Sequence, residues 1–87
     1  VPKHSKEAVK WYRKSARQGY AIAQYNLAQK YKYGEGGLEK SNLYAYAWFN
    51  IAVIGYAAAK KEKDILAKAM TAEQITKAQE LSRELLK

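Results

Sequence analysis

A pattern of small and aromatic residues occurs twice in this chain of 87 residues. The two copies, 37 positions apart, are Ala8-x-x-Trp11-Tyr12-x-x-Ser15 and Ala45-x-x-Trp48-Phe49-x-x-Ala52. A second pattern recurs with an offset of 36, as Gly19-Tyr20-Ala21-x-Ala23 and Gly55-Tyr56-Ala57-x-Ala59. Repeats of this length made of helices predict an α-solenoid, in which each helix pair buries its faces only against its neighbours.

Helical spacing of apolar residues, with glycines between the periodic segments, predicts an all-α chain of about five helices. Thr71 and Gln74 have the spacing of a capping box, which marks the start of the last helix. The predicted helices cover residues 5–18, 21–33, 42–54 and 57–69, and a final segment that begins at residue 71.

The 17 residues from Leu43 to Ala59 contain Asn50 as their only strongly polar side chain. A membrane span needs about 20 apolar residues, and Gly55 shortens the helical part of this run further. A helix that is apolar all round is otherwise one surrounded by other helices. We therefore expect a buried helix and no membrane span. An aromatic binding surface stays open as an alternative, because Tyr44 and Tyr46 need not both point inward.

The side chains that enzymes and metal sites use are sparse in this sequence. Cysteine is absent, and His4 is the only histidine. Glu62 and Asp64 are two residues apart on a predicted helix, so they point away from each other. The glycine-rich segment 34–37 lacks the Gly-Lys-Ser/Thr ending of a phosphate-binding loop. We therefore predict a noncatalytic protein without a cofactor or a metal.

Residues 8–36 resemble the Sel1-like repeat, a relative of the tetratricopeptide repeat. The resemblance rests on small, aromatic and glycine residues at the family's spacing: Ala8, Trp11, Tyr12, Ser15, Ala16, Gly19, Ala23, Leu27, Tyr31, Gly34 and Gly36. Two departures are Ala28, where the family usually has glycine, and Lys63, where the repeat has leucine. The match is strong to about residue 59 and loose after it.

The resemblance implies a right-handed α-solenoid of antiparallel helix pairs. It also implies that residues 1–19 are the second helix of a truncated repeat, that 20–54 form a complete repeat, and that 55–87 form a divergent terminal repeat with a capping helix. On this interpretation the chain is the C-terminal fragment of a longer bacterial array. The sequence leaves its compartment undecided.

In related tetratricopeptide arrays, the helix that corresponds to residues 21–33 lines a concave groove and grips peptides. If Leu27 and Ala28 point inward, a helical wheel sends six residues to the opposite side, and we call them the partner face: Ile22, Tyr25, Asn26, Gln29, Lys32 and Tyr33. The alternative is that an exposed helix simply carries polar residues and tyrosines. Four lysines of the next helix would bias the groove toward acidic segments: Lys60, Lys61, Lys63 and Lys68.

The chain has 16 Lys and Arg against eight acids, a net charge of +8. Five cations form one stripe on the first predicted helix, which we call the basic face: Lys6, Lys10, Arg13, Lys14 and Arg17. Clustered cations bind phosphate backbones and other anionic surfaces, so nucleic-acid binding is the alternative function. Against it, Trp11 and Tyr12 are predicted on the buried side, where no base could stack. We predict a protein-binding scaffold.

If residues 1–19 lack their partner helix, the apolar stripe through Trp11 is incompletely covered. Exposed apolar surface of this kind favours association, so we expect the chain to self-associate. Sedimentation velocity at increasing protein concentration checks this expectation. A species that is strictly monomeric and highly stable at all concentrations would contradict it.

Overall fold

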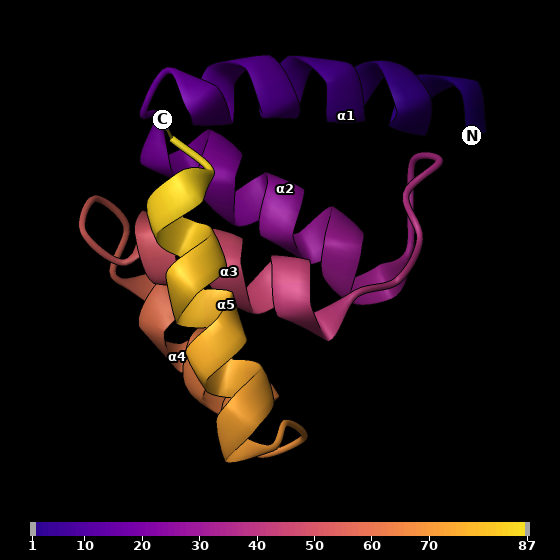
Figure 1. Cartoon of the computed structure of the whole chain (residues 1–87). Helices are drawn as coiled ribbons and strands as arrows, with labels where there is room; N and C mark the ends of the chain where they lie inside the picture. The colour runs from indigo at the N-terminus through magenta and orange to yellow at the C-terminus, as the bar shows by residue number, and fades with distance from the viewer. Residues whose placement is uncertain (1, 87) are drawn as a thin grey trace.

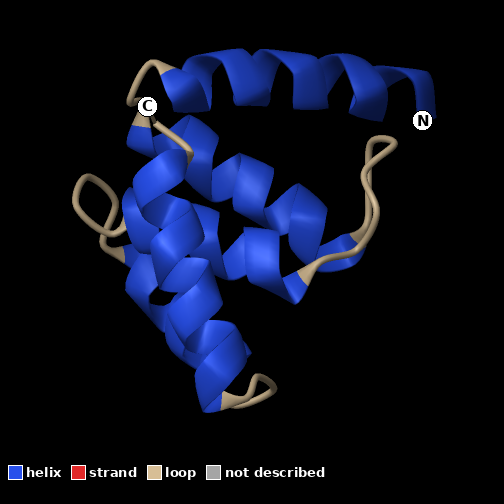
Figure 2. Ribbon diagram, viewed as in Figure 1, coloured by secondary structure: helices blue, strands red, loops and turns tan. Residues whose placement is uncertain are grey.

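The computed structural model describes residues 2–86, with side chains from Lys6 onward, so the side chain of His4 lies outside the described ones. The described residues form five α-helices and no strand (Figures 1 and 2). The helices are α1 (Pro2–Arg17), α2 (Ala21–Tyr33), α3 (Asn42–Ala52), α4 (Ala58–Ala67) and α5 (Ala72–Glu84). The predicted all-α class is confirmed.

The helix ends follow from identifiable caps. Gly34 ends α2 in the left-handed conformation, with φ of 67°, which glycine adopts without steric cost. The hydroxyl of Ser41 accepts a hydrogen bond from the Tyr44 backbone N–H at the start of α3. Thr71 and Gln74 form the predicted capping box at the start of α5. The structure differs at α3 and α4, which end at Ala52 and Ala67, each two residues before its predicted end.

The most buried helix is α3, which packs against α2, α4 and α5. Phe49 has no exposed surface and Trp48 is 2% exposed. Tyr46 is also buried, whereas Tyr44 is partly exposed and stacks on Tyr31 of α2 with a centroid distance of 5.1 Å. No helix of the described part is long and apolar enough to cross a membrane. The expectation of a buried helix is confirmed.

One of the two asparagines of α3, Asn50, joins three helices. Asn50 donates a hydrogen bond from Nδ2 to Oγ of Ser82 in α5, at 3.0 Å. Its Oδ1 accepts a hydrogen bond from Nζ of Lys63 in α4, at 3.2 Å. A polar group in a packed interface is costly unless it is hydrogen-bonded, and here both ends of the amide have partners. Asn50 therefore fixes α4 and α5 against α3.

The stripe of the first helix that was predicted to face inward is only partly covered by other helices. Val9 and Ala16 are buried, but Trp11 is 66% exposed. In the second copy of the pattern, Trp48 lies on α3, which packs against three other helices. By contrast, α1 packs mainly against α2. The placement of Trp11 on the buried face is thus wrong, and the expectation that the stripe is incompletely covered is confirmed. Val9 is a core residue that lies outside the repeated pattern Ala8-x-x-Trp11-Tyr12-x-x-Ser15.

A buried polar contact joins α1 to α2. Gln24 donates a hydrogen bond from Nε2 to the backbone carbonyl of Ala16, at 3.1 Å, and Gln24 itself is buried. Carbonyls in the last turn of a helix have no partner within that helix. The carbonyl of Ala16 also accepts a hydrogen bond from the Gly19 backbone N–H, at 3.1 Å. The side chain of Gln24 is therefore its second donor, and it ties the end of α1 to α2.

The turn after α3 lies close against the start of α2. A Cβ added to Gly55 would lie 2.7 Å from Cβ of Ala21, which is much closer than van der Waals contact. We expect Gly55→Ala to lower the free energy of unfolding by about 1–3 kcal/mol, as overpacked sites do. Urea denaturation followed by circular dichroism measures the change.

The matched control is Ala21→Gly in both backgrounds, because it removes the atom that the new methyl group would meet. The double variant should be more stable than Gly55→Ala alone. If Ala21→Gly lowered the free energy of unfolding equally in both backgrounds, the contact with Cβ of Ala21 would not be the reason why Gly55→Ala is destabilising.

Candidate functional site

Two residues of the partner face project from α2 with most of their surface exposed. Ile22 and Tyr33 are each 61% exposed, whereas Leu27 and Ala28 on the opposite side of α2 belong to the core. Asn26, between them on the helix, is partly exposed. An aliphatic, an amide and an aromatic side chain therefore line one face of a well-packed helix.

Tyr25 has a different position from the one that the helical wheel suggested. Its ring packs edge-on against Phe49 of α3, with centroids 5.5 Å apart, and against Tyr56 at 4.9 Å. Gln29 donates a hydrogen bond from Nε2 to the Tyr25 hydroxyl at 2.9 Å. Both residues are partly buried, so they brace the partner face against α3 and the α3–α4 turn and leave less surface free than we expected.

Lys32 connects the partner face to α4. Its Nζ lies 3.0 Å from Oε1 of Glu62, and both side chains are mostly covered. The hydrogen bond to Glu62 raises the pKa of Lys32 above its ordinary value, since it stabilises the charged ammonium. The same Nζ lies 5.2 Å from the centroid of the Tyr33 ring. Lys32 is thus held in an ion pair and neutralised by Glu62.

The four lysines of α4 do not act together as a positive extension of this surface. Lys63 turns toward α3, where it binds Asn50 and lies 5.9 Å from the centroid of the Tyr46 ring. Lys60 pairs with Asp64 at 3.2 Å. Adjacent residues of an α-helix point about 100° apart, which explains why a run of lysines cannot share one face. Lys61 and Lys68 remain exposed.

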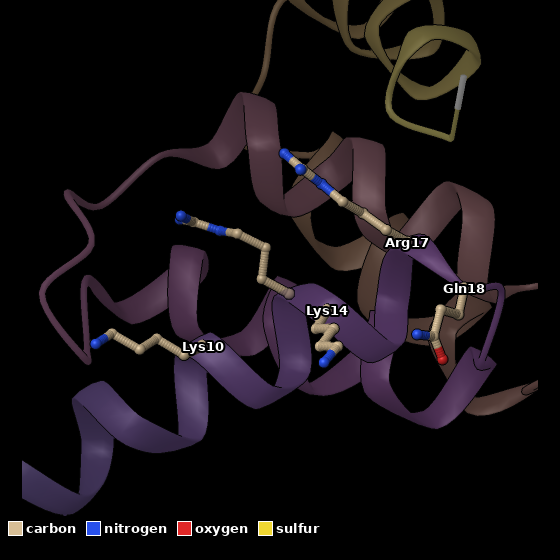
Figure 3. A pocket seen from close by; sticks show the side chains of 5 residues that line it. Lys10, Lys14, Arg17 and Gln18 are labelled. Carbon is tan, nitrogen blue, oxygen red and sulfur yellow. The ribbon is translucent and has the colours of Figure 1, made fainter.

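The basic face of α1 is exposed along its whole described length. Four of its cations line a hollow of about 450 Å³ together with Gln18, and their side chains spread outward from the helix (Figure 3). These four residues are Lys10, Arg13, Lys14 and Arg17. All lie on α1, so the hollow is part of one helix surface and is not a cleft between elements.

Trp11 lies on the same helix, one turn before Lys14, and residues three apart on a helix are neighbours. The sequence argument against the alternative function assumed that Trp11 was buried. The exposure of Trp11 removes that assumption. Tyr12 is partly buried and packs against the core, as predicted.

The described residues contain no group of three or more His, Asp or Glu side chains that could hold a metal ion. The surfaces described above offer apolar contact, hydrogen bonds and positive charge.

A comparison with protein-family models matches the Sel1 repeat to residues 1–20 and 21–53. The chain belongs to the Sel1 repeat family. A solved structure supports this: a protective antigen present in uropathogenic Escherichia coli strains and displaying an SLR fold superimposes with a TM-score of 0.87 and 33% sequence identity. The match covers 94% of this chain and 18% of that protein. A comparison with curated proteins gives no match.

Within these Sel1 repeats, the partner face lies in the second matched stretch and the basic face in the first. Sel1 repeats generally serve as protein-interaction scaffolds, and the α-solenoid class predicted from the sequence is confirmed by the superposition. The comparisons do not test the particular residues of either face, which remain a prediction.

The two tryptophans provide a spectroscopic check of α1. In the Trp48→Phe variant we expect red-shifted emission from Trp11 and strong quenching by acrylamide, whereas the Trp11→Phe variant should emit from a buried, protected Trp48. Iodide should quench Trp11 better than caesium does, because neighbouring cations concentrate anions. Equal quenching of the two variants by acrylamide would contradict the exposure of Trp11.

Proposed function

We propose that this chain is a noncatalytic adaptor that binds a protein or peptide through the partner face of α2. The observation that carries the proposal is the pair of exposed side chains, Ile22 and Tyr33, on a helix whose opposite side is buried. Tyrosine supplies a large contact area at a small cost in conformational entropy. Asn26 adds an amide that can bond to a peptide backbone.

Contacts within the protein hold this surface in place before any partner arrives. Tyr25 is packed against two rings, and Lys32 is paired with Glu62. Binding costs free energy when interface side chains and loops have to be ordered. Because these residues are already ordered by α3 and α4, a partner would meet a rigid helix face, and Tyr25 acts as a brace more than as a contact residue.

The chemistry of the neighbouring surface suggests the composition of the partner segment. Lys61 of α4 and Lys68, which directly follows this helix, are exposed, while Lys32 is neutralised within the protein. A segment with apolar side chains at its centre and acidic residues toward α4 would complement this arrangement. The apolar contacts should supply most of the affinity, since exposed ion pairs contribute little.

Site-specific photo-crosslinking tests the proposal. A photoreactive phenylalanine analogue at Tyr33 should cross-link a protein from a nuclease-treated lysate of the source organism at physiological salt. The same analogue at Ile54, which is 94% exposed in the α3–α4 turn, is the control position. Cross-links at Ile54 and none at Tyr33 would show that the partner binds elsewhere.

A pair of matched variants measures the contribution of the face. We expect Ile22→Ala with Tyr33→Ala to lower affinity for the identified partner by about tenfold or more, as loss of an aromatic anchor does. The control is Ile54→Ala with Tyr20→Ala, which removes the same side-chain types from other exposed positions. Equal binding by both double variants would contradict the proposed site.

A further inference from the structure

Residues 6–17, which carry the basic face, contribute half of the net charge of the chain. From residue 6 to residue 17 there are five cations and one acid, Glu7, which gives a net charge of +4 out of the +8 of the whole chain. The ion pairs among the described residues neutralise lysines of α2, α4 and α5 and none of these five. The charge of the molecule is therefore concentrated on one helix.

The arrangement of these cations is unfavourable for the helix itself. Like charges three or four residues apart repel each other on a helix surface. Five such pairs occur here: Lys6 with Lys10, Lys10 with Arg13, Lys10 with Lys14, Arg13 with Arg17, and Lys14 with Arg17. By contrast, α4 and α5 place opposite charges four residues apart, in Lys60–Asp64 and Glu73–Lys77. The dipole of α1 favours cations only in its last turn, so it does not account for Lys6, Lys10 or Arg13.

The internal repeat allows the residues of the basic face to be compared with the equivalent residues of α3. With the offset of 37, the basic face corresponds to Leu43, Ala47, Asn50, Ile51 and Ile54, none of which is charged. Ala47 is buried, and Asn50 bonds to Ser82 of α5. In Figure 1, α5 crosses α3, while α1 lies along one edge of the molecule. In the second copy, the middle of this face is covered where α5 packs on α3, whereas Ile54 at its end is 94% exposed.

We propose that the basic face of α1 is a second interaction surface, which binds an acidic α-helix of a partner protein. In the second copy, the equivalent face packs against α5 around Asn50, and the five cations of the basic face select a helix of opposite charge. Two copies of the basic face would repel each other, so this surface does not pair with itself. The proposal is independent of the partner face on α2.

An acidic helix matches the spacing of the cations. Apart from the adjacent pair Arg13 and Lys14, successive cations of the basic face lie three or four residues apart, which is a rise of about 4.5–6 Å along α1. Carboxylates three or four residues apart on a second helix have the same rise, so two helices lying side by side bring opposite charges together at every turn. Trp11 at the border of the face provides an exposed apolar surface for an aliphatic side chain of the partner.

Arg17 marks the end of this surface. It lines another hollow together with Glu84, Leu85 and Leu86 from the end of α5. A carboxylate of the chain itself therefore lies near the last cation. We expect Lys10, Arg13 and Lys14 to contribute most of the binding.

A nucleic acid fits the basic face less well. Binding to single strands without sequence preference combines cations with several aromatic side chains on which successive bases stack. Among the side chains of α1 from residue 6 onward, Trp11 is the one mostly exposed aromatic residue, since Tyr12 is partly buried against the core. Nucleic-acid binding is therefore treated as a competing outcome of the experiment.

Fluorescence anisotropy tests the proposal on the whole chain. The probe is a labelled helical peptide with a glutamate on every turn of one face, titrated at physiological salt. The variant Lys10→Glu with Lys14→Glu should weaken binding by at least about tenfold, because two attractive contacts become repulsive. Its matched control, Lys40→Glu with Arg83→Glu, changes the net charge equally at two exposed positions outside both faces and should leave most of the affinity intact.

Two further measurements separate the alternatives. A peptide of the same composition with its glutamates spread around the helix should bind more weakly than the probe, and a single-stranded oligonucleotide of equal charge should not displace the probe efficiently. Circular dichroism should show that the variant on α1 keeps its helix, because the two changes turn three repulsive pairs (6–10, 10–13 and 14–17) into attractive ones and add one repulsion, with Glu7. Absence of peptide binding, equal loss in the control variant, or stronger binding of the oligonucleotide would each overturn the proposal.

Discussion

The packing of α3 against α2, α4 and α5 determines how the other helices are placed. Phe49 and Trp48 are almost completely covered, and full burial of a large apolar side chain stabilises a fold by about 1.5–3 kcal/mol. Small residues such as Ala45 and Ala52 allow the neighbouring helices to approach closely enough to cover these rings. Both faces described above lie on helices outside this centre, so binding can use exposed side chains without disturbing the core.

Much of this arrangement could be predicted from the sequence. The bounds of α2 and the capping box before α5 agree with the pattern of apolar residues and cap residues, because these features depend on a few neighbouring positions. The burial of α3 could be predicted for the same reason, since a helix without a polar face has no side to turn toward water. The candidate residues on both faces were also chosen from such patterns, and their roles in binding remain a prediction.

The positions that could not be predicted depend on contacts between helices far apart in sequence. Trp11 and Trp48 occupy equivalent places in the repeat, and only the neighbours of each helix make one exposed and the other buried. Tyr25 appeared free on a helical wheel, yet it packs against Tyr56, a residue 31 positions later. Lys63 was assigned to a positive surface, but the amide of Asn50 binds it on the opposite side of α4. A helical pattern gives the direction of a side chain and does not give its neighbours.

Two adjacent residues of α4, Glu62 and Lys63, connect this helix to two different neighbours. Glu62 holds Lys32 of α2, and Lys63 holds Asn50 of α3, in directions about 100° apart around the axis of α4. Both bonds therefore depend on the same rotation of the helix about that axis. A ligand that rotated α4 about its axis and separated Glu62 from Lys32 would also strain the bond between Lys63 and Asn50. The two bonds together therefore resist rotation of α4.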